Sequence, residues 1–138
     1  MFYLDSSVAV SAVSAEKGTD AVLKWLSAHE DVLTSDWLMT EATAALSQKR
    51  RMGVLAAEEH AQAVAALHRQ IGGTFTSLPV TRQDFRLAAR FAERADTRLR
   101  AGDALHLAIA SAAGATLVTL DKKQACAGEL LQVKTLLL

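Results

Sequence analysis

Short apolar segments alternate with amphipathic helical segments along most of the chain, and this alternation restricts the fold more than any other feature of the sequence. Apolar runs bounded by turn residues predict strands, whereas apolar residues three or four positions apart predict helices. The predicted strands cover residues 2–4, 32–34, 74–80 and 116–120, and the tail at 131–138 is a candidate edge strand. The predicted helices follow Ser6-Ser7, cover residues 19–28, begin at 35 or 36, cover 56–70 and 82–95, and begin near 103. Such alternation predicts an α/β fold, in which helices cover both faces of a parallel sheet.

The size and composition of the chain are those of one ordinary globular domain. It has 138 residues, and we expect a single domain over residues 1–138. The formal net charge is zero, so attraction to a nucleic acid would have to come from local basic patches. A single cysteine excludes an internal disulfide, and no apolar run approaches the ~20 residues that a membrane span needs. We therefore expect a cytoplasmic protein with no membrane segment.

Four acidic residues stand where the surrounding segment is apolar or where a new element begins. Asp5 and Asp121 each end a strand-like run, Asp103 opens a helical stretch, and Glu41 interrupts the apolar face of a helix. Ligands bind at the carboxyl ends of the strands in an open α/β sheet, so these acids could converge on one pocket. Each aspartate has an alternative role as a helix cap, and Glu41 has one as a salt-bridge partner of an arginine or lysine. Crowded carboxylates resist simultaneous ionisation, so convergence would predict a hard divalent cation between them.

The acids lie in four short segments that together span nearly the whole chain. These segments are Tyr3-Leu4-Asp5-Ser6-Ser7, Thr40-Glu41, Arg100-Ala101-Gly102-Asp103-Ala104-Leu105-His106-Leu107-Ala108 and Thr119-Leu120-Asp121. They resemble the acidic motifs of PIN-domain ribonucleases, especially VapC-type toxins. The resemblance implies a three-layer α/β/α sandwich with a central parallel sheet and Mg²⁺-dependent cleavage of RNA. It also implies inhibition by a small antitoxin protein encoded beside the toxin.

The resemblance also implies roles for particular residues. By position in the motifs, the catalytic acids would be Asp5, Glu41, Asp103 and Asp121. Asp5 and Asp103 would be the most direct metal ligands, and Ser6 and Thr119 would hydrogen-bond a water or a carboxylate. Oxygen ligands suit Mg²⁺ or Mn²⁺, and the sequence lacks the thiolate and imidazole clusters of zinc or copper sites.

Basic and aromatic residues provide further candidates for binding. Arginines recur at every fourth position of one predicted helix, and a second basic cluster follows an earlier helix; they are Arg82, Arg86, Arg90, Arg94 and Lys49-Arg50-Arg51. A solvated helix face is the simpler explanation of the stripe alone, but beside an acidic metal site the arginines would contact the RNA backbone. We predict that four apolar residues lie in the core: Trp25, Trp37, Leu38 and Met39. If they are partly exposed, we expect them to anchor an antitoxin. We expect His106 to pack and hydrogen-bond structurally, although it lies one turn beyond Asp103 and could face the site.

Together these features predict a metal-dependent endoribonuclease that is the toxin of a type II toxin-antitoxin pair. Its substrate would be RNA, its partner a small cognate antitoxin, and its oligomeric state a homodimer. The alternative is a PIN-fold module that binds RNA or protein without cleaving it. A receiver-like phosphoacceptor domain is less favoured, because Asp5-Ser6-Ser7 replaces the adjacent acidic pair that such a domain carries after its first strand.

Overall fold

A five-stranded parallel sheet forms the centre of the computed structural model, which describes residues 1–16 and 18–138. The strands lie in the order β3-β2-β1-β4-β5, and the neighbouring strands are parallel. Their bounds are β1 Phe2–Leu4, β2 Val32–Ser35, β3 Thr76–Leu78, β4 Thr116–Thr119 and β5 Thr135–Leu137. Because β1 lies between β2 and β4, the segments that follow these three strands leave the sheet side by side at its carboxyl edge.

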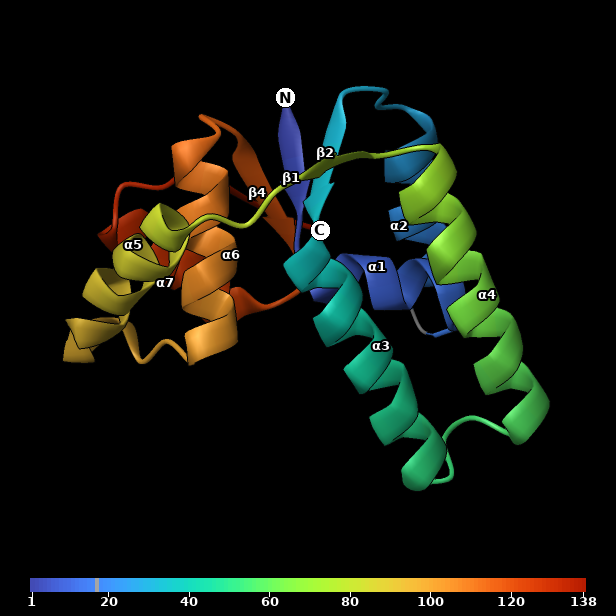
Figure 1. Cartoon of the computed structure of the whole chain (residues 1–138). Helices are drawn as coiled ribbons and strands as arrows, with labels where there is room; N and C mark the ends of the chain where they lie inside the picture. The colour runs from blue at the N-terminus through green and yellow to red at the C-terminus, as the bar shows by residue number, and fades with distance from the viewer. Residues whose placement is uncertain (17) are drawn as a thin grey trace.

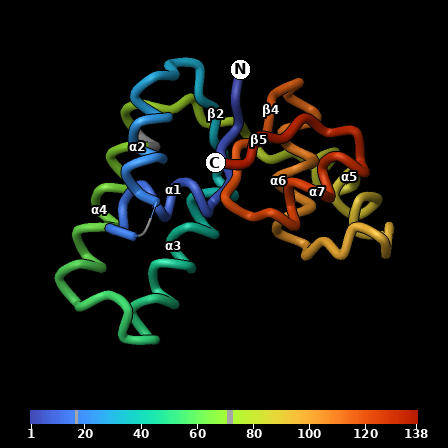
Figure 2. Tube along the Cα trace, turned by 180° about the vertical axis from the view of Figure 1, so that it is seen from behind, coloured from blue at the N-terminus to red at the C-terminus, as the bar shows by residue number. Residues whose placement is uncertain are grey.

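Helices cover both faces of the sheet, as two opposite views show (Figure 1; Figure 2). One side carries α1 Ser6–Val13, α2 Thr19–Ser27, α3 Asp36–Arg51 and α4 Ala57–Gly73. The other side carries α5 Arg82–Glu93, the 3-10 turn η1 Ala95–Thr97, α6 Ala101–Ala112 and α7 Lys122–Leu130. The predicted three-layer α/β/α sandwich is therefore confirmed. Within the described ranges, no helix has both the length and the apolar character required to traverse a bilayer.

Successive strand residues point into two separate cores. Tyr3 and Leu117 pack with apolar residues of α6, whereas Leu4 and Val118 pack with apolar residues of α1 and α3. All four side chains are fully buried. Side chains alternate between the faces of a strand, so a central strand covered on both sides must be apolar at successive positions. This requirement explains why β1 and β4 are recognisable in the sequence as continuous apolar runs.

Element boundaries differ from the prediction at two places that matter for the site. The strand predicted over 74–80 is shorter and ends at Leu78, because Pro79 has no N–H to donate to a neighbouring strand. Helix α6 begins at Ala101, so Asp103 lies in its first turn and does not open it. The candidate edge strand in the tail is confirmed as β5.

Candidate functional site

Acidic residues from separate elements line one cavity at the carboxyl edge of the sheet. Asp5 follows β1, Asp121 precedes α7 and Asp103 lies in the first turn of α6. All three line a cavity of about 390 Å³. Ser6 lines the same cavity and joins Glu41 of α3 to the group, since its hydroxyl donates to Glu41 Oε2 at 2.6 Å. The structure thus brings the four predicted acids to one edge of the sheet.

Asp5 is buried, and both of its carboxylate oxygens accept hydrogen bonds; its exposed fraction is 4%. Oδ2 accepts from the backbone N–H and the hydroxyl of Ser7 and, at 3.0 Å, from the hydroxyl of Thr119. Oδ1 accepts from the side-chain amide of Gln124 at 3.4 Å and lies 3.6 Å from His106 Nε2. Asp5 is therefore the N-cap of α1 and a member of the acidic site at the same time.

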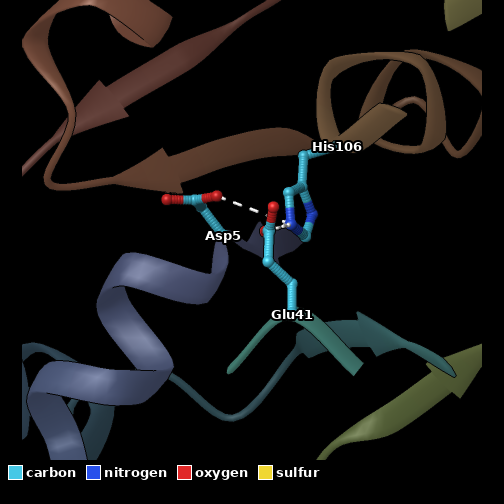
Figure 3. A group of neighbouring side chains, drawn as sticks. All are labelled: Asp5, Glu41 and His106. Carbon is cyan, nitrogen blue, oxygen red and sulfur yellow. Dashed lines mark hydrogen bonds and ion pairs between the residues drawn. The ribbon is translucent and has the colours of Figure 1, made fainter. Parts of the chain in front are cut away.

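Glu41 is fixed by a histidine and a serine. Its Oε2 lies 2.7 Å from His106 Nε2 and accepts the Ser6 hydrogen bond as well. Figure 3 shows the side chains of Asp5, Glu41 and His106 directed toward one another. Burial raises the pKa of Glu41, but the hydrogen bonds from His106 and Ser6 outweigh burial and hold that pKa below its ordinary value. Glu41 is therefore a carboxylate at neutral pH, and its partners are a ring and a hydroxyl in place of a lysine or an arginine.

A chain of buried hydrogen bonds supports His106 from behind. The hydroxyl of Tyr3 lies 3.0 Å from His106 Nδ1 and 2.7 Å from the hydroxyl of Ser35. Burial raises the pKa of Tyr3, so its phenol keeps its proton and can donate it to Nδ1. With Nε2–H donating to Glu41, both ring nitrogens of His106 have a hydrogen-bond partner. His106 packs and hydrogen-bonds as predicted, and it also faces the site, the alternative that the sequence left open, because its Nε2 contacts Glu41 and lies near Asp5.

Because Gly102 has no Cβ atom, the Glu41 carboxylate can lie against the backbone of α6. A Cβ atom built on Gly102 would collide with Glu41 Oε1 and would lie 3.5 Å from the Trp37 ring. The first turn of α6 therefore approaches the carboxylate more closely than any other residue type allows. The motif that contains Asp103 thus also shapes the position of Glu41.

Asp103 and Asp121 lie at the rim of the cavity and are half-buried. Burial raises the pKa of Asp103, the Arg100 backbone N–H opposes this effect, and the negative charges of Asp5, Asp121 and Glu41 raise it further. Asp121 caps α7 by accepting the Lys123 and Gln124 backbone N–H groups on Oδ1, at 2.7 and 3.3 Å. Neither aspartate forms an ion pair with a basic side chain among the described residues.

Two residues of the site were missed by the sequence analysis. Ser7 has no predicted role beyond preceding the first predicted helix, but its hydroxyl donates to Asp5 and accepts from the Leu120 backbone N–H at 3.0 Å. Gln124 is 1% exposed, and its amide contacts Asp5 and the backbone oxygen of Asp103. The spacing of Ser7 two residues after Asp5 was an available signal. No local signal marks Gln124, because its partners are more than 20 residues away.

The donor set fits a hard divalent cation. Asp5, Glu41 and His106 each offer one ligand atom, and these atoms lie within 4.8 Å of one another. In the hydrogen-bonding pattern described above, His106 Nε2 serves Glu41, so carboxylate oxygens remain as the available ligands. Asp103 adds another carboxylate, and a cation would relieve the repulsion that raises its pKa. Oxygen ligands of this kind suit Mg²⁺ or Mn²⁺.

The arginines of the predicted stripe are exposed, and none of them lines the acidic cavity. They are Arg82, Arg86 and Arg90 on α5 and Arg94 immediately after it. Arg94 pairs with Asp96 at 2.6 Å and donates to the Leu130 backbone oxygen at 2.8 Å. In the second basic cluster, Lys49 does line the cavity, where it pairs with Glu16 at 2.7 Å.

Of the four residues of α2 and α3 that were predicted to lie in the core, only one is fully buried. Leu38 is fully buried, whereas Trp25, Trp37 and Met39 are partly buried and pack against the cores from outside. Trp37 also lines an apolar cavity of about 240 Å³ between α3, α5 and α6. Phe85, which is 55% exposed, forms part of the same cavity.

Comparisons with known proteins agree with this architecture. A family model described as PIN domain matches residues 2–130. VapC20 of Mycobacterium tuberculosis, described as a sarcin-ricin loop cleaving toxin, is 23% identical with a TM-score of 0.74, over 93% of this chain and 95% of that chain. FitAcB from Neisseria gonorrhoeae is 20% identical with a TM-score of 0.70, over 98% and 96%. VapBC2 from Rickettsia felis, bound to a promoter DNA fragment, is 15% identical with a TM-score of 0.68, over 99% and 98%. A comparison with curated proteins gave no significant match.

Proposed function

The chain belongs to the PIN-domain family, and from this premise we propose that it is a metal-dependent endoribonuclease and the toxin of a type II toxin-antitoxin pair. One observation carries the proposal: carboxylates from three separate elements line a single cavity at the carboxyl edge of a parallel sheet. This edge is where ligands bind in open α/β folds. If these acids served only to stabilise the fold, there would be no reason to place half-buried carboxylates where they repel one another.

Asp5 and Asp103 would hold the metal ion, with Mg²⁺ the expected ion and Mn²⁺ a substitute. When bound, the ion would lower the pKa of a coordinated water and neutralise charge on the scissile phosphate. The hydroxyls of Ser7 and Thr119 and the amide of Gln124 fix the orientation of Asp5 before any ligand arrives. Such preorganisation removes the free-energy cost of ordering a metal ligand during the reaction.

Glu41 would orient the attacking water and accept its proton. The lowered pKa of Glu41 keeps the carboxylate ionised, and the bonds from Ser6 and His106 occupy Oε2. The second oxygen, Oε1, faces Gly102 and is free of hydrogen bonds from the described residues. Asp121, at the cavity rim, would accept a hydrogen bond from a second water, and that water would supply the proton that the departing oxygen takes up. Ser6, Ser7, Thr119 and His106 act in this scheme as positioning residues.

The proposed protein partner is a small antitoxin that covers the cavity. An arginine of the antitoxin would pair with Asp5 or Asp103 in bidentate geometry and compete with the metal, and of the two Asp103 is the more exposed. An apolar anchor of the antitoxin would occupy the cavity formed by Trp37 and Phe85. We also propose a homodimer. Expression with the product of a short adjacent reading frame, followed by metal titration of the free protein and the complex, tests the antitoxin at the site.

Cleavage of an RNA stem-loop with an exposed loop tests the enzymatic proposal. We expect cleavage in Mg²⁺ or Mn²⁺, none in chelator, and a loss of at least about 100-fold in Asp5→Asn and Asp103→Asn, since both replace a metal ligand. Asp31→Asn is the matched control, because Asp31 is an exposed aspartate immediately before β2, at the opposite end of the strand from the acidic edge. Melting temperatures of all three variants establish that the fold survives.

Two results would contradict the proposal in different ways. Full cleavage in chelator would exclude the metal-dependent mechanism. Metal and RNA binding without cleavage would favour the alternative of a non-cleaving PIN-fold module.

A further inference from the structure

A second cavity adjoins the acidic cavity and shares Asp103 and Asp121 with it. Its volume is about 590 Å³, within the range of about 300–1,000 Å³ found for ligand sites. It lies between the segment from η1 to the first turn of α6 and helix α7, along which its lining runs from Lys122 to Leu130. The charged side chains that line it beyond the two shared acids are Asp96, Arg98, Arg100, Lys122 and Lys123. We call this second cavity the basic groove.

The basic residues of the groove are exposed and available. Arg98, Arg100, Lys122 and Lys123 form no ion pair with any acid of residues 1–16 and 18–138. The groove's remaining acid, Asp96, is already neutralised by Arg94, which bonds to both of its carboxylate oxygens. In a chain of zero net charge, the groove is therefore a local concentration of positive charge beside a local concentration of negative charge.

The backbone ties these cations to the acids of the site. Asp121 accepts the Lys123 backbone N–H, which fixes the first turn of α7 against the shared rim. Asp103 accepts the Arg100 backbone N–H, and Arg98 adopts the left-handed conformation, with φ 52°, that turns the chain into this segment. The backbone positions of the cations relative to the acidic cavity are thus set by the first turn of α7 and by the short connection 98–100 that leads into α6.

A polyanion is the ligand that this arrangement fits. Phosphates in the basic groove would be held by lysine and arginine, while the next phosphate along the strand would lie over Asp103 and Asp121, where a cation is needed to receive it. Partly buried Leu99 and exposed Leu130 on the groove wall offer apolar surface for sugars or bases. A single strand suits a groove with cations on both walls better than a duplex does.

We propose that the basic groove holds the backbone of a single-stranded RNA segment on one side of the bond to be cleaved. This inference rests on the proposed function and adds the residues that position the substrate. The groove adjoins the acids directly, whereas Arg82, Arg86 and Arg90 of the α5 stripe line neither cavity.

Equal charge removal from the groove and from α5 distinguishes the two surfaces. The groove variants are Lys122→Gln/Lys123→Gln and Arg98→Gln/Arg100→Gln, and the matched control is Arg86→Gln/Arg90→Gln. Binding of a fluorescent oligouridylate is measured over a salt series in chelator, so that cleavage does not contribute. Removal of one cation that neutralises a phosphate should lower the slope of log K against log salt by about 0.7, so each groove variant should show a decrease of up to about 1.4. The α5 control should keep the parent slope.

Cys126 supplies an independent measurement because it is the single cysteine of the chain, is exposed, and lines the groove. Saturating oligouridylate should slow its alkylation by a maleimide at least about fivefold if the strand occupies the groove, an amount that corresponds to about 1 kcal/mol of protection. The Lys122→Gln/Lys123→Gln variant should lose this protection at the same RNA concentration. The α5 control should retain it.

The proposal would be overturned if both groove variants kept the parent slope or if only the α5 variant changed it. It would also be overturned if the parent did not bind oligouridylate or if oligouridylate did not protect Cys126. Cleavage of the stem-loop in Mg²⁺ is measured separately on the same proteins. If cleavage depends on metal but the groove variants bind oligouridylate like the parent, the proposed function stands and only the RNA-binding role of the groove is rejected. If no protein cleaves the stem-loop but the groove variants bind oligouridylate more weakly than the parent, the groove is supported and the proposed cleavage activity is contradicted.

Discussion

The four acids of the site fall into two groups that differ in the partners they have acquired, and only Asp5 of the four is buried while the other three are half-buried. Asp5 and Glu41 belong to an inner group, where hydroxyls, an amide and an imidazole bond to their carboxylate oxygens. Asp103 and Asp121 form a rim group, where the hydrogen bonds come from backbone N–H groups at helix starts. The inner acids are therefore held by side chains from distant parts of the chain, and the rim acids by their own helices.

This difference follows from the free energy of burying charge. A buried carboxylate without partners costs several kcal/mol, so Asp5 must be surrounded by donors, whereas half-buried Glu41 receives its donors on one oxygen. A rim acid keeps part of its hydration and can remain underneutralised, which leaves negative charge for a cation or for a basic side chain of a partner. The inner group provides fixed geometry, and the rim group provides electrostatic attraction.

Apart from replacement of the proposed metal ligands, the largest effect should come from filling the space beside Glu41. Gly102→Ala places a methyl group against Glu41 Oε1 and should lower RNA cleavage about 10- to 100-fold, as mutation of a residue that supports a metal site does. Stability should be retained, because alanine favours a helix by up to about 1 kcal/mol over glycine. Gly73→Ala at the end of α4 is the control, since nothing lies within 4 Å of its added Cβ. Full cleavage activity in Gly102→Ala would show that the position of Glu41 is not critical.

A smaller effect should follow from removing one hydroxyl behind the inner group. Tyr3→Phe leaves His106 Nδ1 and the Ser35 hydroxyl without their shared partner, and should lower the free energy of unfolding by about 1–2 kcal/mol. Thr40→Val is the control, because the exposed Thr40 hydroxyl bonds only to its own helix at Asp36 O. Urea denaturation of both variants measures the difference. Equal stability of the two would mean that the buried chain of hydrogen bonds adds nothing to folding.

The smallest effects should have opposite signs in the two groups. The pKa of Glu41 is lowered from 4.5, so its charge stabilises the fold above that pH, and this contribution is lost as the pH falls through the folded-state pKa. The pKa of Asp103 is raised from 3.8, so its contribution is present below that pH and is lost as the pH rises through the folded-state pKa. At pH 7 in chelator, Glu41→Gln should therefore destabilise the protein and Asp103→Asn should stabilise it or leave it unchanged.

Both changes should be below about 1 kcal/mol, because partial exposure screens these charges. Chemical denaturation between pH 3 and pH 7 tests the signs, with the exposed Glu30→Gln as control. Destabilisation by Asp103→Asn at pH 7 would identify Asp103 chiefly as a helix cap. The difference between Asp103→Asn and the parent should disappear in acid, where the aspartate is protonated.

Local sequence patterns were sufficient for the layers of the fold and for the rim of the site. The apolar runs of β1 and β4, the acids that follow them and the helix starts beside them are signals that span only a few residues. A strand buried on both faces must be apolar, and an acid at its end must leave the core, so both features are visible without the fold. The end of β3 is an exception, because strand propensity extended the prediction across Pro79, where an edge strand ends.

The sequence by itself determined that acids would lie at strand ends and helix starts, whereas the tertiary structure decided which partners they would have. His106 and Glu41 are 65 positions apart, and Gln124 and Asp5 are 119 apart, so no periodicity connects them. The arginine stripe on α5 is conspicuous because its spacing is local, yet the cations beside the acids are Arg98, Arg100, Lys122 and Lys123, which two separate helix starts bring together. Hydrogen bonds and electrostatic fields depend on distance in space, and chain folding alone sets that distance for residues far apart in sequence.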